Sequence, residues 1–262
     1  MTYLIIDSII LMLQLAVITF DGLILFVFIR NKQLYRNIAH RLTLFVATTD
    51  FLHAFTTLPY TIYLTIFCAT EPVNLEPYYI MISSTPLIIQ MKVKLTLTAA
   101  IALQRTMALF FPISYRSSSS TLFTSISLLL GVSLACGDLF LEFILSPIKS
   151  SPGCGTIGCF VSDQFLFYWG TSNMVLGIVV VIFTFMILFK LHSIEKKQSG
   201  NKYSNREANG YNQANRTTAG ILLTTLFFLT LPSVGVGIME MVGFSIFRRV
   251  GPFYSTGLLC AG

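Results

Sequence analysis

The stretch VLGIVVVIFTFMILF, residues 175–189, carries no charged side chain and is apolar on every side. A strand of a membrane barrel would alternate apolar and polar residues over about ten positions, and this stretch does not alternate. With its flanks it forms an apolar segment over 164–190, and about 20 such residues cross the hydrocarbon core of a bilayer as a helix. The segment therefore predicts a transmembrane helix.

The composition of the whole chain agrees with a membrane location. The chain has 262 residues, of which 54% are hydrophobic and 11% are charged, and its mean hydropathy is +0.75. Soluble domains carry about 25% charged residues. We therefore expect one bundle of helices in lipid rather than a water-soluble domain.

Six segments are long and apolar enough to span, and a seventh begins near Val250 and reaches Gly262 after about a dozen residues, too few to cross. The prediction is an all-α membrane protein: a single seven-transmembrane domain over 1–262 with a truncated seventh helix. The expected spans are 6–30, 42–67, 80–109, 121–147, 164–190, 217–246 and, in part, 250–262.

The basic residues predict the orientation of the bundle. Of the 17 Lys and Arg residues, twelve fall in or beside the connections 30–41, 105–120 and 190–216, and only Lys149, Arg248 and Arg249 fall on the opposite side. Cytosolic loops of membrane proteins carry the excess of Lys and Arg. We expect a multi-pass protein of the plasma membrane with its N-terminus outside.

Several function classes find no support in the sequence. The net charge of +6 is spread over short loops, where it suits anionic lipid or a cytosolic partner, and no basic patch typical of nucleic-acid binding is present. No HExxH, nucleophile elbow or phosphate-binding loop occurs. The five cysteines match no zinc pattern. We predict no enzyme activity, no metal site and no cofactor.

Charged residues inside the spans predict ion pairs, because an unpaired charge in lipid is costly. Depth in the membrane predicts that Lys94 pairs with Asp50, with Asp21 nearby. Lys92 is two residues from Lys94, which corresponds to about 200° around the helix, so it is expected to face Asp138 instead. Two interpretations stay open. The pairs hold helices together, or the Asp50–Lys94 pair is a switch that differs between two receptor states.

Three stretches resemble rhodopsin-like receptors. They are the second-helix acid motif LFVATTD (44–50), the third-helix end around Arg105 and Pro112, and the sixth-helix proline in FFLTLP (227–232). The finer resemblance is to nematode serpentine chemoreceptors, most like class BC. It is carried by ALQRTMALFFPISYR (102–116) and CGTIGCFVSDQFLFYWGTSNMVLG (154–177), and it covers nearly the whole chain.

The resemblance implies a rhodopsin-like bundle that binds a small odorant or pheromone-like stimulus outside and couples to a heterotrimeric G protein inside. It implies that Arg105, with Pro112 and Tyr115 beyond it, faces the G protein. It also places Asp50 at the acid of the family's internal sodium site, where the Lys94 ammonium would make sodium unnecessary.

The chain departs from the receptor pattern at several positions. Gln104 replaces the acid beside Arg105, Leu229–Leu231 replace the aromatic residue before the proline, and the outer end of the third helix has Tyr79 and Ile80 instead of a cysteine. The NPxxY segment would lie beyond Gly262. An ion-coupled transporter and a non-functional truncated receptor product remain the alternatives.

The stimulus pocket is expected between the outer halves of the third, fifth and sixth helices. Anchoring at the membrane interface is the expected ordinary role of Trp169. The pocket candidates are Leu87, Met91, Trp169, Asn173, Ser233 and Glu240.

Three cysteines fall on the outer, oxidising side: Cys68, Cys154 and Cys159. They allow three pairings, and sequence does not choose among them. We favour a bond from Cys68 to Cys154 or Cys159 over the small Cys154–Cys159 loop.

Overall fold

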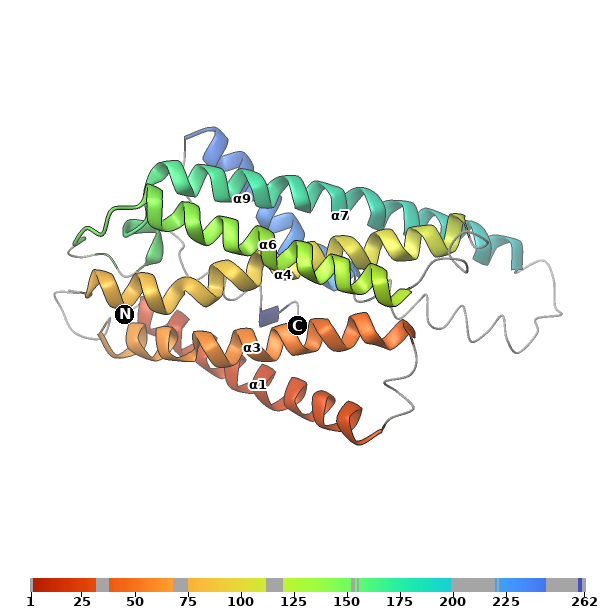
Figure 1. The fold of residues 1–262 in the computed structure, drawn as a ribbon, viewed down its shortest axis with the longest axis horizontal. Helices are drawn as coiled ribbons and strands as arrows, with labels where there is room; N and C mark the ends of the chain where they lie inside the picture. Colours follow the sequence, from red (N-terminus) through yellow and green to blue (C-terminus); the bar gives the residue numbers. More distant parts are fainter. Residues whose placement is uncertain are drawn as a thin grey trace.

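The computed structural model describes residues 2–31, 38–67, 75–111, 120–151, 154, 156–198, 220, 222–243 and 259–260, and every regular element within these ranges is helical. Figure 1 shows the helices as one elongated bundle. Its elements are α1 (Thr2–Arg30), α3 (Ile38–Phe67), α4 (Pro77–Phe110), α6 (Ser120–Leu145), the 3-10 turn η1 (Ile157–Cys159), α7 (Asp163–Gln198), the π-helical turn η2 (Leu226–Thr230) and α9 (Leu231–Met241).

Five segments of the described chain are long and apolar enough to cross a membrane by length and composition. They are Ile6–Arg30, Pro77–Phe110, Leu122–Leu145, Asp163–Ser193 and Leu222–Met241. The predicted all-α membrane bundle is confirmed. Most of 250–262 lies outside the described residues, but Leu259 packs against Ile10 and Ala54.

Helix α3 is long enough to span, at 30 residues, yet it is not among these five segments, and threonines recur along it. Its threonines show how such a helix suits lipid, since their hydroxyls bond back to the helix itself. Thr57 Oγ1 donates to the carbonyl of His53 at 2.6 Å, and Thr61 Oγ1 to that of Thr57 at 3.2 Å. Polar groups satisfied within the segment do not need water.

The central position in the bundle belongs to α4. It packs against α3, α6 and α7, while α1 lies along α3 and α9 along α7 (Figure 1). In the most apolar window of α4, 61% of residues are buried inside the protein, against 17% for α1. Side chains on opposite faces of α4 therefore meet different helices.

The described surface is apolar and much of the interior is polar, the reverse of a soluble protein. Ile29, Leu129 and Phe189 are more than 70% exposed, whereas Asp50, Lys94 and Glu142 are under 5% exposed. Large exposed apolar patches mark surfaces that meet a partner or a membrane. Here they run along the spans, so the partner is lipid.

Glycines set the distance between α7 and α9. A Cβ atom on Gly237 would lie 2.5 Å from Met174 Cβ and 2.8 Å from the carbonyl oxygen of Gly170. A Cβ on Gly177 would lie 3.0 Å from Val234 Cγ2. Small residues let membrane helices approach closely, so α9 packs tightly on α7 beside the candidate site.

Candidate functional site

The first polar feature inside the bundle is the α3–α4 ion pair, formed by Asp50 and Lys94. Lys94 Nζ lies 2.7 Å from Asp50 Oδ1, and both side chains are 5% exposed or less. The pairing predicted from depth and periodicity is therefore present. Its role as a switch stays a prediction.

Asp21 of α1 lies close enough to Asp50 and Lys94 to interact electrostatically with both. It is 6% exposed, and among the described residues its Oδ2 has no hydrogen-bond partner. His53, one turn from Asp50, is also buried, and neither ring nitrogen has a described partner. The region around the α3–α4 ion pair thus contains more polar atoms than the pair satisfies.

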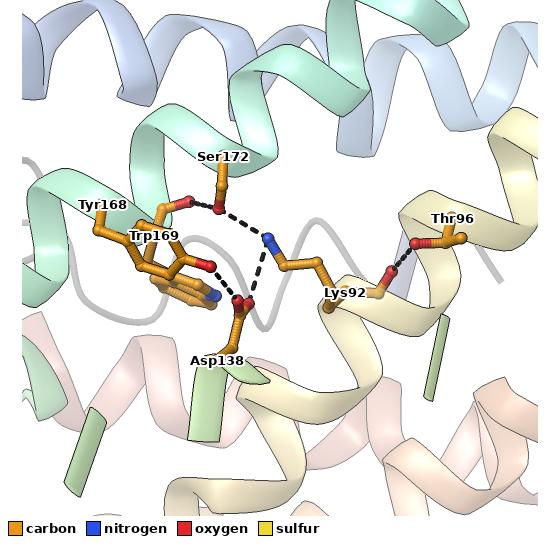
Figure 2. A network of polar contacts seen from close by, with 6 residues as sticks. All are labelled: Lys92, Thr96, Asp138, Tyr168, Trp169 and Ser172. Carbon is orange, nitrogen blue, oxygen red and sulfur yellow. Dashed lines mark hydrogen bonds and ion pairs between the residues drawn. The ribbon is translucent and has the colours of Figure 1, made fainter. Parts of the chain in front are cut away.

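The second feature is the α6 network, formed by Lys92, Asp138, Tyr168 and Ser172 (Figure 2). Lys92 Nζ lies 3.1 Å from Asp138 Oδ2 and donates to Ser172 Oγ at 2.7 Å. The Tyr168 hydroxyl donates to Asp138 Oδ1 at 3.0 Å. The predicted turn of Lys92 toward Asp138 is confirmed, and the network joins α4, α6 and α7.

The six pocket candidates lie along one interface, the α4–α7–α9 seam. Leu87 and Met91 of α4 share a hydrophobic cluster with Trp169 of α7 and with Leu229 and Val236. The other three lie one helical turn from members of this cluster and are at most 8% exposed. These three are Asn173, Ser233 and Glu240.

The expected interface role of Trp169 is wrong. Its side chain is 4% exposed, and its ring stacks on Phe165 with centroids 6.3 Å apart, inside the cluster of the seam. Trp169 faces inward because it packs in one cluster with Met91 of α4 and Val236 of α9. Asn173, one turn away, is fully buried, and neither atom of its amide has a partner among the described residues.

Arg105 lies three turns from Lys94 on α4, about 16 Å along the axis. It stands between Ile101 and Leu109, which cluster with Ile187 of α7 and Leu222. Its side chain is half-buried, and its Nε has no hydrogen-bond partner in the described part of the chain. Pro112 and Tyr115 lie outside the described residues.

The favoured pairing of Cys68 with Cys154 or Cys159 is wrong. Cys154 and Cys159 bond to each other, with their Cα atoms 6.4 Å apart, and Cys68 lies outside the described residues. The short loop brings the two thiols together because η1 turns the chain back between them, and the Cys159 N–H donates to the Thr156 carbonyl at 3.2 Å.

Sequence reasoning missed the neutral members of the α6 network. Tyr168 and Ser172 stand four residues apart on one face of an apolar helix, and that spacing was the available signal. A buried ion pair needs further hydrogen bonds to offset its desolvation. Two hydroxyl side chains on one face of an apolar helix therefore indicate donors or acceptors for such a pair. The bond from Gln14 Nε2 to Thr57 Oγ1, 3.0 Å across α1 and α3, was missed for the same reason.

Comparison with known proteins gives the family. A search of curated proteins found no match to this chain. A family model described as Serpentine type 7TM GPCR chemoreceptor Srbc matches residues 1–257, which confirms the expected class BC resemblance. That family is a class of receptors and not of enzymes. On a match of this extent, the chain belongs to the Srbc family of serpentine seven-transmembrane chemoreceptors.

Proposed function

We propose that this chemoreceptor binds a small external stimulus in the α4–α7–α9 seam and signals to a heterotrimeric G protein. It would do so in the plasma membrane with its N-terminus outside and the basic connections in the cytosol, as the distribution of Lys and Arg favours. Asp50 and Lys94 form the switch between the two sites.

Arg105 is the observation that carries this proposal. A guanidinium is always charged and presents a fixed fork of donors. Here its Nε is buried with no partner in the described ranges, one turn from Ile101 and from Leu109, which cluster with Leu222. Buried polar groups are normally hydrogen-bonded, so an acceptor from another molecule, such as a G-protein carbonyl, would complete the site.

The position of the α3–α4 ion pair supports a link between the two sites. Lys94 stands on the same helix as Arg105 and as Leu87 and Met91 of the seam. A stimulus that shifts α7 or α9 against α4 would change what surrounds both Lys94 and Arg105. A two-state element that both sites bias is what coupling between sites requires.

Nucleotide exchange tests the proposal. We expect the full chain in lipid nanodiscs to accelerate GTPγS binding to a heterotrimeric G protein without added stimulus. Arg105→Ala should slow this at least about tenfold, because losing one partner of a buried charged contact costs about 2–5 kcal/mol.

Arg30→Ala is the matched control, since Arg30 is exposed at the end of α1 and lies over the Phe26 ring, 5.9 Å from its centroid. Its exchange rate should equal that of the wild type. If Arg105→Ala and the wild type exchange nucleotide at the same rate, Arg105 does not face the G protein.

A further inference from the structure

A buried carboxylate of α6 takes no part in the ion pairs described above. Glu142 of α6 has no exposed surface, and neither of its oxygens has a hydrogen-bond partner in the described part of the chain. Isolated buried carboxylates are strongly unfavourable. Glu142 therefore needs either a proton or a partner that the described residues do not supply.

The spacing along α6 shows where Glu142 faces. Asp138, Glu142 and Ser146 follow one another at four-residue intervals and so share a face of the helix. Asp138 accepts from the Tyr168 hydroxyl at 3.0 Å, and Ser146 Oγ accepts from the Ser162 N–H at 3.0 Å. Glu142 lies between these two contacts, against the first turns of α7.

The charges on this face do not balance. Asp138 is matched by the single ammonium of Lys92 at 3.1 Å, and Glu142 adds a second carboxylate one turn away. No other Lys or Arg ion pair reaches α6 within the described residues. The α6 network is one positive charge short whenever Glu142 is ionised.

Aromatic rings lie on the same side of this site. Phe165, Tyr168 and Trp169 occupy the first turns of α7, with the Phe165 centroid 6.4 Å from that of Tyr168 and 6.3 Å from that of Trp169. Figure 2 shows the Tyr168 and Trp169 rings beside Asp138. The negative faces of aromatic rings attract ammonium groups.

We propose that Glu142 binds the charged group of a monocationic stimulus, a protonated or quaternary amine, with the aromatic rings of α7 around it. This assignment rests on the proposed function and names the ligand class of the receptor. The cation supplies the missing charge, and its organic part reaches the cluster of the seam, against which Leu141 and Leu145 of α6 also pack.

The site is closed in the structure, and this ties binding to movement. Glu142 has no exposed surface, and Ile157 of the disulfide-closed loop packs against the same cluster. A stimulus must part the end of α6 from α7, where Ser146 meets Ser162 and Asp138 meets Tyr168. Binding therefore changes a helix contact, as a receptor requires.

Thermal unfolding of the full chain in nanodiscs tests this assignment without any G protein. The probes are trimethylammonium, tetramethylammonium and 2-phenylethylammonium, with 2-phenylethanol as the uncharged analogue. At least one ammonium probe should raise the Tm by about 2 °C or more, and 2-phenylethanol should not. A wild-type Tm that no ammonium probe raises, or that 2-phenylethanol raises equally, overturns the assignment.

Substitutions locate the effect. Glu142→Gln should abolish the shift and, without probe, unfold no lower than the wild type, because it removes an unmatched carboxylate. Glu142→Asp should keep part of the shift. Asp7→Asn, which removes a buried carboxylate of α1 (3% exposed), should keep all of it. A Glu142→Gln chain that still responds, or that unfolds at lower temperature without probe, contradicts the assignment.

The outcome separates this inference from the proposed function. A probe-induced shift with no nucleotide exchange in the same nanodiscs would retain the cation site and remove G-protein coupling. Exchange that depends on Arg105, with no shift from any ammonium probe, would do the reverse.

Discussion

Lys94 and Asp50 each depend on the other for their charge inside the membrane. Their 2.7 Å contact is almost completely shielded from the surroundings. In a buried pair the attraction between the charges roughly offsets their desolvation, so removing one partner costs much more than removing both.

Single and double substitutions of the α3–α4 ion pair should therefore be strongly non-additive. We expect Lys94→Met to destabilise the fold by about 3–5 kcal/mol, and Asp50→Asn together with Lys94→Met to recover most of this loss. Thermal unfolding in nanodiscs measures both. Additive losses would mean that the pair contributes nothing as a pair, and a Lys94→Ala chain that inserts and signals normally would rule out both the structural and the switch interpretations.

Sodium should have no effect on signalling through this site. The Lys94 ammonium already supplies a positive charge to Asp50, and the resemblance to rhodopsin-like receptors places Asp50 at their sodium-binding acid. Basal GTPγS exchange should be unchanged when sodium chloride is replaced by equimolar potassium chloride. Lys94→Met, which leaves the Asp50 carboxylate without its ammonium, is the variant in which a sodium dependence should emerge.

The charged residues of the site could be predicted from sequence because helical periodicity and the cost of charge in lipid leave few arrangements for them. Lys92 and Lys94 are two residues apart and must face different helices, and the structure pairs them so. Trp169 and the disulfide could not be predicted. The burial of Trp169 depends on the rotation of α7 against two neighbours, and the disulfide depends on a turn in a loop.

At the scale of elements, the contact between α7 and α9 depends on the absence of side chains. The positions of Gly170 and Gly237 could be read from the sequence, but that they oppose each other across two helices could not. That register follows from the packing of whole helices. The π-helical turn η2 before Pro232 could not be predicted from the sequence either. In this turn Thr230 Oγ1 donates to the Thr225 carbonyl, five residues back, at 3.2 Å.

Adding one methyl group should separate α7 from α9. Gly237→Ala places its Cβ 2.5 Å from Met174 Cβ, and overpacking of this kind costs about 1–3 kcal/mol. Gly235→Ala is the matched control on the same helix, because nothing lies within 4 Å of its added Cβ. Thermal unfolding should show a loss of stability for Gly237→Ala and no loss for Gly235→Ala. Equal stability of the two variants would mean that the close approach carries no strain.

The disulfide-closed loop should add a modest share of stability. Its cysteines are five residues apart, and closing so short a loop restricts the unfolded chain by about 2 kcal/mol. We expect Cys154→Ser with Cys159→Ser to lose about this much. Cys68→Ser should lose nothing, and peptide mapping under non-reducing conditions should recover Cys154 linked to Cys159. A Cys68-containing linked peptide would contradict the pairing.

At the scale of the whole molecule, the membrane bundle and the family are established, and the orientation is a proposal. An epitope tag at residue 1 should be accessible to antibody on intact cells. A tag within 193–216 should become accessible only after permeabilisation, because the Lys and Arg of that connection belong to the cytosolic side. Two tags on the same side of the bilayer would exclude the proposed receptor topology.

The two ammonium groups of α4 have a consequence for how the molecule can move. Lys92 and Lys94 leave the helix in nearly opposite directions and are held by α6 and α3 respectively. Any rotation of α4 about its own long axis would stretch both contacts at once, so strengthening of one could not offset weakening of the other. A rearrangement that spares these contacts must leave α4 stationary and shift its neighbours.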